Sequence, residues 1–277
     1  MELYPGNKYF DHDGIRLSYV DWGKRDSDTL VLMHGLQDCA RSWDDFSASL
    51  SDQFRIIALD SRGHGDSARA SNDSYGFDDY VSDLGALLNH LSIKHPILIG
   101  HSAGGRYCFT YASRNPGMVK ALIVVDIDPD PYNESSSHMF DRYFSEEDVW
   151  PSLDAVIERL RSRQPLSSET FLNHQAEVMT RSLDHDNSDQ RQWKRDRLLL
   201  TCYERPDLWE EWKRISCPTV LIRGRQSDLL THDTAVKMRE SLQGSLLIEL
   251  EGGGHWFYQE SPGAFETAVR WFLEGVL

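Results

Sequence analysis

The sequence of 277 residues predicts an α/β fold, in which helices flank a mostly parallel, eight-stranded sheet and a helical segment is inserted as a cap. Three observations predict this class. Short runs rich in Val, Ile and Leu recur along the chain, helical patterns separate them, and one long interval lacks any such run. Continuous apolar runs are typical of strands buried on both faces, and their alternation with helices is typical of a parallel sheet.

An antiparallel hairpin is predicted at the edge of the sheet, because Asp13-Gly14 can supply the positive φ of a tight turn between residues 8–12 and 15–21. The remaining strands are predicted at residues 29–33, 55–59, 96–99, 121–125, 218–222 and 246–250. Helices are predicted at residues 40–49, 76–91, 102–114, 231–241 and 261–274. Ser261-Pro262 begins the last of them as an N-cap followed by proline at the first helical position.

Residues 127–216 contain no convincing strand but several amphipathic helical stretches, so we interpret them as a helical cap. The core domain then consists of residues 1–126 and 217–277. The cap contains too many aromatic and apolar residues for a simple loop. We expect most of them to form a small local core and some to line a pocket.

The overall charge and the cysteines restrict the class of protein. A formal net charge of -15 disfavours nucleic acid and anionic membranes as partners, because phosphate contacts require an excess of Lys and Arg. The four cysteines are scattered without a close pair, which fits a reducing compartment. The first residues lack a secretory pattern, and no stretch approaches the length of a membrane span. We therefore expect a cytoplasmic protein, either a monomer or a homodimer, whose partner is a small-molecule substrate.

The strongest chemical signal is the segment Gly100-His101-Ser102-Ala103-Gly104, which lies between a predicted strand and a predicted helix. This G-x-S-x-G pattern forms a strained turn that presents a nucleophilic serine at the carboxyl end of the sheet. Glycines are needed because a Cβ would collide with neighbouring backbone there. The pattern predicts Ser102 as a nucleophile and the amide of Ala103, at a helix N-terminus, as an oxyanion donor.

A serine hydroxyl needs a base and an acid that orients the base. His255 follows the last predicted strand and the run Gly252-Gly253-Gly254, so it is the predicted base. Asp228, in the loop after the strand 218–222, is the predicted acid, and the order Ser, Asp, His agrees with this arrangement. Asp126, at the end of another predicted strand, remains the main alternative.

Further residues are expected beside this site. His34-Gly35 follows the strand 29–33 and allows close backbone approach, so the Leu36 amide is the predicted second oxyanion donor. We expect His34 itself to be structural. Arg106 lies one helical turn after Ser102 and is a candidate for binding a substrate carboxylate, although pairing with a structural acid such as Asp126 is the alternative.

Together these motifs resemble the α/β-hydrolase superfamily. They are HG at 34–35, D-x-R-G-H-G-x-S at 60–67, GHSAGG at 100–105 and GGGHW at 252–256. The resemblance implies carboxylesterases, lactonases, amide hydrolases, or the hydrolases that cleave carbon-carbon bonds of ring-fission products. The last group also has an aromatic residue after the histidine, which makes Trp256 a candidate substrate contact. A serine nucleophile departs from the aspartate of epoxide hydrolases and haloalkane dehalogenases.

The predicted function is that of a serine hydrolase that cleaves a small carboxylic ester, lactone or amide through an acyl-serine intermediate. A carbon-carbon bond hydrolase is the alternative enzyme, and a small-molecule receptor on the same fold is the alternative outside enzymes. We expect no cofactor and no metal, because neighbours such as His185-Asp186 and His232-Asp233 lack a third ligand at a convincing spacing.

Overall fold

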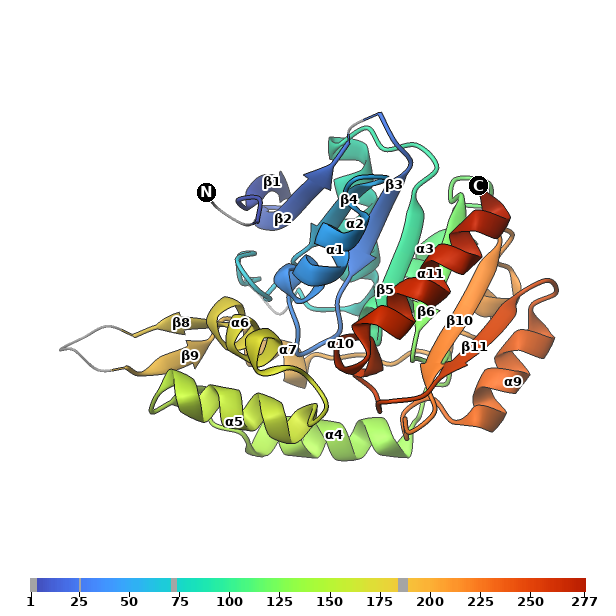
Figure 1. Ribbon diagram of the computed structural model, residues 1–277. Helices are drawn as coiled ribbons and strands as arrows, with labels where there is room; N and C mark the ends of the chain where they lie inside the picture. The colour runs from blue at the N-terminus through green and yellow to red at the C-terminus, as the bar shows by residue number, and fades with distance from the viewer. Residues whose placement is uncertain (1–3, 25, 71–73, 184–188) are drawn as a thin grey trace.

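A single eight-stranded sheet forms the centre of the computed structural model, which describes residues 4–24, 26–70, 74–183 and 189–277 (Figure 1). The strand order is β1-β2-β4-β3-β5-β6-β10-β11, and only the pairs β1–β2 and β2–β4 are antiparallel. This confirms the predicted fold class, and every predicted strand overlaps an observed one. The strands are β1 (Lys8–His12), β2 (Ile15–Gly23), β3 (Thr29–Met33), β4 (Arg55–Leu59), β5 (Ile97–His101), β6 (Ala121–Val125), β10 (Thr219–Gly224) and β11 (Leu246–Leu250).

Helices cover both faces of the sheet. Alternate side chains of each strand point to opposite faces, so the apolar strands present two apolar faces that must be covered. In β3, Leu30 and Leu32 belong to one apolar cluster, whereas Val31 and Met33 belong to the other. The first cluster includes residues of α1 (Asp44–Leu50) and α11 (Pro262–Val276), and a 3₁₀ turn (Ala40–Trp43) precedes α1. The second includes residues of α2 (Phe77–His90), α3 (Ala103–Arg114) and α9 (His232–Ser241). Burial on both faces explains the continuous apolar runs.

The cap region lies at one end of the sheet in Figure 1 and contains strands as well as helices. Its helices are α4 (Glu134–Ser145), α5 (Leu153–Arg163), α6 (Glu169–Met179), α7 (Leu198–Thr201) and α8 (Trp209–Lys213). A three-stranded antiparallel sheet joins β7 (Val149–Trp150), β9 (Arg191–Trp193) and β8 (Thr180–Ser182). The predicted helices are present in the cap, but these three strands were not predicted. Strands of two or three residues are too short to produce a recognisable pattern.

The middle of the cap interval and its carboxyl end pack against different parts of the molecule. Side chains of α5, α6 and β9 form an apolar cluster of their own, which includes Ile157, Leu172 and Trp193. In contrast, α8 packs on the core helix α3, where the rings of Trp212 and Phe109 are 5.6 Å apart. The cap is thus anchored to the core at its carboxyl end.

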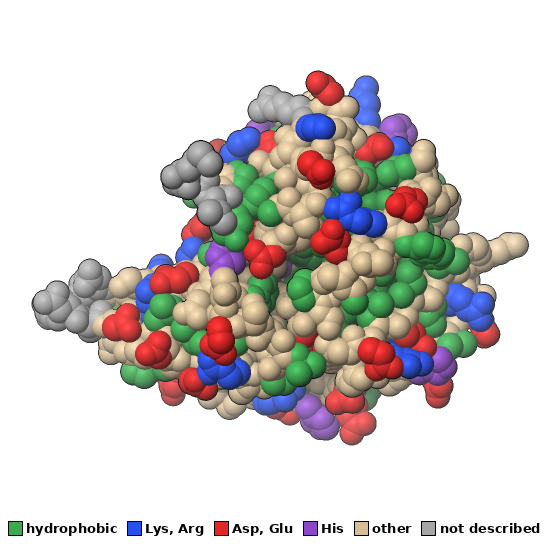
Figure 2. Space-filling model, in the orientation of Figure 1, with side chains coloured by type: hydrophobic (Ala, Val, Ile, Leu, Met, Phe, Trp, Pro, Cys, Tyr) green, Lys and Arg blue, Asp and Glu red, His purple; other side chains and the backbone are tan. Residues whose placement is uncertain are grey.

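The surface shown in Figure 2 carries interspersed acidic and basic side chains without a continuous basic patch. Within the described ranges, no helix combines the length and the apolar character that crossing a membrane requires. The same residues contain no group of three or more His, Cys, Asp or Glu side chains placed to hold a metal ion. His185 and Asp186 lie outside the described residues.

Candidate active site

Ser102 lies in a sharp turn between β5 and α3, with φ of 53° and ψ of -127°. Its amide donates to the carbonyl of Val125 at 2.9 Å, which ties this strained residue to the neighbouring strand β6. The flanking glycines are required by space. A Cβ on Gly104 would lie 2.5 Å from the Met33 carbonyl oxygen, and one on Gly100 would lie 2.4 Å from the Gly104 carbonyl oxygen. The turn therefore has the predicted form.

His255 lies in the loop between β11 and α10 (Phe257–Glu260), and its imidazole joins two side chains. Nε2 is 3.0 Å from the Ser102 hydroxyl, and Nδ1 is 2.8 Å from Oδ2 of Asp126. Burial lowers the pKa of His255 to about 3, so the imidazole is neutral near pH 7. A neutral imidazole that donates from Nδ1 to the carboxylate has its Nε2 lone pair free to accept the serine proton.

Asp126 follows β6 and is fully buried, with φ of 52°. Its Oδ1 accepts from the Gly224 amide at 3.2 Å, and its Oδ2 accepts from the Ser227 hydroxyl at 2.5 Å. Burial raises the pKa of Asp126 to about 7, while these two donors oppose the rise. The carboxylate is thus held by strand β10 and its loop, facing the histidine.

Asp228 does not occupy the predicted position. It is exposed in the loop after β10, and none of the described hydrogen bonds joins it to His255. Its neighbour Ser227 points inward and donates to Asp126 instead. Because β6 lies between β5 and β10 in the sheet, an acid at its end is closer to the nucleophile. The prediction of Asp228 as the partner of His255 was therefore wrong, and the alternative Asp126 takes that place.

The loop after β3, residues 34–39, passes close to the serine, and we call it the β3 loop. A Cβ on Gly35 would lie 3.1 Å from Cβ of Ser102, so only glycine permits this approach. Neither the Leu36 amide nor the Ala103 amide has a partner among the hydrogen bonds of the described residues. Both residues line the small cavity at Ser102. As expected, His34 is structural, since its Nε2 accepts from the Ser61 amide at 3.0 Å.

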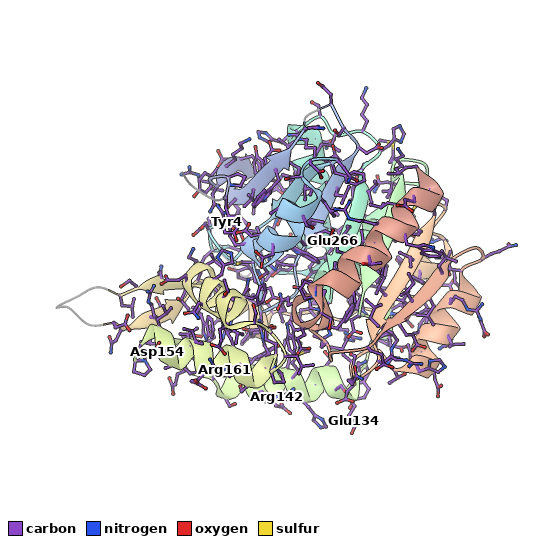
Figure 3. The ribbon with its side chains drawn as sticks, in the orientation of Figure 1. Tyr4, Glu134, Arg142, Asp154, Arg161 and Glu266 are labelled. Atoms are coloured by element: carbon purple, nitrogen blue, oxygen red, sulfur yellow. The ribbon has the colours of Figure 1, made fainter. Side chains whose placement is uncertain are left out.

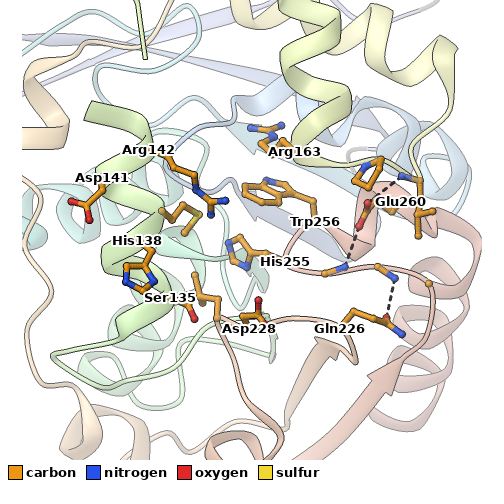
Figure 4. A pocket seen from close by; sticks show the side chains of 17 residues that line it. Ser135, His138, Asp141, Arg142, Arg163, Gln226, Asp228, His255, Trp256 and Glu260 are labelled. Carbon is orange, nitrogen blue, oxygen red and sulfur yellow. Dashed lines mark hydrogen bonds between the residues drawn. The ribbon is translucent and has the colours of Figure 1, made fainter. Parts of the chain in front are cut away.

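Two adjacent cavities lie at this site. The inner cavity has a volume of about 20 Å³ and is lined by Ser102, Leu36 and Ala103. The outer cavity has a volume of about 930 Å³ and is drawn in Figure 4. They share four lining residues: Met139, Leu229, His255 and Trp256. A ligand in the outer cavity therefore meets the histidine before it meets the serine.

Arg106 does not reach either cavity. Its guanidinium is fully buried and donates to the backbone carbonyls of Asp128, at 2.6 Å, Asp130, at 3.1 Å, and Pro206. The prediction that it binds a substrate carboxylate was therefore wrong, because the side chain runs beneath the cap instead of toward the serine. The nearest acid is Asp128, 4.0 Å away, and not Asp126.

Trp256 is placed as a substrate contact requires, since it lines both cavities. Its ring centroid is 4.9 Å from that of His255, and the guanidinium carbon of Arg163 lies 4.8 Å from the ring. Whether it binds substrate stays a prediction.

The sequence reasoning missed two cap arginines that line the outer cavity, Arg142 of α4 and Arg163 of α5. Figure 3 places Arg142 on the cap, and Figure 4 shows both side chains directed toward Trp256. The guanidinium of Arg142 has no hydrogen bond or ion pair with any described residue. One signal was available, because Arg142 follows the buried Met139 by three residues and so shares its helix face.

Comparisons with known proteins identify the family and the fold. The family model described as the alpha/beta hydrolase fold matches residues 28–262. The chain is 25% identical to a 2-(acetamidomethylene)succinate hydrolase of Mesorhizobium japonicum, over 88% of this chain and 87% of that protein. It is 28% identical to a non-heme chloroperoxidase of Streptomyces lividans, over 95% of this chain and 97% of that protein. The crystal structure of E-2-(acetamidomethylene)succinate hydrolase superposes with a TM-score of 0.88 at 23% identity, covering 97% of this chain and 99% of that one.

Proposed function

Because this chain belongs to the α/β-hydrolase fold family and is a hydrolytic enzyme, we propose that it cleaves a small carboxylic ester, lactone or amide through an acyl-serine intermediate. One observation carries the proposal, namely the continuous hydrogen bonds from Asp126 through His255 to Ser102, at 2.8 and 3.0 Å. This arrangement activates a serine hydroxyl for attack on a carbonyl. Relatives named as hydrolases favour turnover over the receptor alternative.

In the proposed mechanism, Oγ of Ser102 attacks the substrate carbonyl carbon while Nε2 of His255 takes the hydroxyl proton. Asp126 stabilises the imidazolium that forms, and the amides of Leu36 and Ala103 donate to the oxyanion. The imidazolium then gives its proton to the leaving alcohol or amine, which departs and leaves the acyl-serine. Water attacks this ester while His255 takes a proton from the water. The imidazolium then returns that proton to Oγ of Ser102 as the carbon–Oγ bond breaks, which releases the carboxylic acid and the free serine.

The cavities support a small substrate that carries an anionic group. An inner cavity of about 20 Å³ has room for roughly one water molecule, so only a small group reaches Ser102 without displacing side chains. In the outer cavity, the guanidinium of Arg142, which pairs with none of the described residues, is a suitable donor for a carboxylate. Three acidic residues also line this cavity. In Figure 4, Asp141 points away from Trp256, and Asp228 lies on the other side of His255. The third, Glu260, accepts from the backbone amides of Gly254, at 3.2 Å, and Leu166, at 3.3 Å. A relative whose name gives a succinate as its substrate supports the same class.

The proposal is tested by steady-state hydrolysis of p-nitrophenyl acetate, butyrate and hemisuccinate by the wild type and a folded Ser102→Ala variant. We expect turnover that the variant loses, with the highest kcat/KM for the hemisuccinate. Serine-dependent turnover without preference for the hemisuccinate would leave the hydrolase proposal standing and contradict the anionic substrate. Failure of the wild type with all three esters and the matching amides would contradict ester and amide cleavage, and ring-fission dienones would then be assayed.

A further inference from the structure

The β3 loop, which carries the Leu36 amide, is held by a buried carboxylate. Asp38 is 3% exposed, and its Oδ1 accepts from Nη2 of the cap residue Arg163 at 3.1 Å. Its Oδ2 accepts from the Tyr258 hydroxyl at 3.3 Å and lies 3.8 Å from Nδ1 of His101. Tyr258 belongs to α10, and His101 immediately precedes the serine. The side chain of Asp38 thus connects the β3 loop with the cap, with the helix α10 that follows His255, and with the turn that carries Ser102.

The buried carboxyl of Asp38 is kept ionised by the charges around it. Although burial alone would raise the pKa of this carboxyl, the charge of Arg163 and the neighbouring imidazoles lower it below its usual value. Asp38 is therefore an anion paired with a cation whose own side chain is only 5% exposed. Breaking one partner of such a pair leaves an uncompensated buried charge, so the pair holds its two segments together.

Other cap residues contact the same loop and the 3₁₀ turn that follows it. Arg163 also donates from Nη1 to the Gln37 carbonyl at 3.5 Å, and Nε of Arg195 donates to the Gln37 side chain at 3.0 Å. The Ser42 hydroxyl donates to Gln175 of α6 at 2.9 Å. Cys39 is buried within the apolar cluster of the cap, although it precedes α1 of the core. The cap therefore fixes both the polar and the apolar side chains of this segment.

These contacts leave the Leu36 amide between two fixed points. On one side, Gly35 lies so close to His101 and Ser102 that an added Cβ would be 2.9 Å from His101 Nδ1 and 3.1 Å from Ser102 Cβ. On the other side, Gln37 and Asp38 are bound by Arg163. Resting on the proposed function, we infer that Asp38 and Arg163 are positioning residues, whose ion pair couples the docked cap to the β3 loop and so places the Leu36 amide for the oxyanion. The oxyanion hole is complete only while the cap is docked.

The inference predicts how Asp38→Asn, Arg163→Met and the double variant behave with a neutral ester such as p-nitrophenyl butyrate. We expect each single change to lower kcat roughly ten- to a hundredfold with KM within about twofold, because a displaced oxyanion donor acts on the transition state. The Ki of a boronic acid, which mimics the tetrahedral intermediate, should rise by the same factor. The kcat of the double variant should be no lower than that of the more impaired single variant, since both changes break the same contact.

Lys194→Met is the matched control. Lys194 forms another cap-to-core ion pair, 2.8 Å from Asp66. Because none of the described hydrogen bonds or ion pairs joins it to the β3 loop, its loss should leave kcat unchanged. Hydrogen exchange tests the coupling without any turnover. The amides of residues 35–39 should exchange faster in Arg163→Met and at the wild-type rate in Lys194→Met.

Three results would overturn the inference: unchanged exchange in Arg163→Met, additive losses in the double variant, or a raised KM at constant kcat. The last would instead make Arg163 a substrate-binding residue. Faster exchange in a protein without Ser102-dependent turnover would uphold the coupling and contradict only the proposed function.

Discussion

Two regions contribute polar groups to the site and hold them in different ways. The first, which we call the sheet end, is the carboxyl edge of the sheet with Ser102 and Asp126, and the second, the cap wall, is the part of the cap that lines the outer cavity. At the sheet end, Ser102 and Asp126 follow adjacent strands with positive φ, and backbone or buried donors satisfy Asp126. On the cap wall, Arg142 extends from a helix and has no partner among the described residues. The difference assigns chemistry to the backbone-held side and recognition to the long side chains. Changes at the sheet end, or at the Asp38–Arg163 pair that positions it, should therefore alter kcat, and a change of Arg142 on the cap wall should alter KM.

The sharpest test of this division compares two aspartates that were both candidates for the acid. We expect Asp126→Asn to lower kcat by about 10⁴-fold, because the amide no longer stabilises the imidazolium or holds the correct tautomer. Asp228→Asn should change kcat less than about twofold, since that carboxylate is exposed and Nδ1 of His255 binds Asp126 instead. Steady-state kinetics on p-nitrophenyl butyrate measure both. Equal losses in the two variants would contradict the assignment of Asp126.

Arg106 tests whether an arginine near the serine contributes to folding or to binding. Replacing it with Met leaves the carbonyls of Asp128, Asp130 and Pro206 without their buried donor. We expect the free energy of unfolding in urea to fall by about 3 kcal/mol. The folded fraction should keep the wild-type KM for p-nitrophenyl hemisuccinate. A raised KM with unchanged stability would return Arg106 to the binding site.

Arg142→Met probes recognition on the cap wall. We expect the KM for p-nitrophenyl hemisuccinate to rise about tenfold, the scale of one charge-assisted hydrogen bond, with kcat within twofold. The KM for the uncharged butyrate should not change, so the ratio of the two values isolates the carboxylate. Arg161→Met, a change on the exposed side of α5, is the control. A similar rise for both esters would show that Arg142 supports the cap instead of binding the carboxylate.

The smallest expected effect is a shift in the pH profile. Activity requires the ionised Asp126, so kcat/KM should fall as the pH falls through the pKa of about 7. The Ser227 hydroxyl donates to the ionised form and lowers this pKa. Ser227→Ala should therefore raise it and move the acid limb to higher pH, by less than about one unit. A limb that stays in place or moves to lower pH would contradict the role of Ser227.

The parts of the fold that follow from local patterns could be predicted from the sequence. Strands buried on both faces appear as apolar runs, and β3, β4, β6 and β11 have the predicted bounds. The serine turn is similarly local, because the steric need for Gly100 and Gly104 fixes its glycine spacing. His255 could be located because it follows the last strand, at the edge where the serine also lies.

Residues whose roles depend on side-chain direction could not be predicted. Asp126 and Asp228 both follow strands that end at the same edge, and only the three-dimensional arrangement shows that Asp126 contacts Nδ1 of His255. Arg106 has the sequence spacing of a substrate contact, yet three backbone carbonyls hold it away from the cavity. The cap strands β7, β8 and β9 form by pairing between segments that are distant in the sequence, and no local pattern predicts this pairing.

The burial of Cys39 gives this enzyme an internal reporter of cap motion. The thiol is 2% exposed and packs among apolar side chains of the cap, and burial raises its pKa far above that of a free cysteine. A thiol reagent can therefore reach it only after a local opening, and separation of the cap from the β3 loop is the opening that would expose the thiol. The alkylation rate of Cys39 would measure how often the cap opens, and substrate analogues that hold the cap closed would slow the labelling.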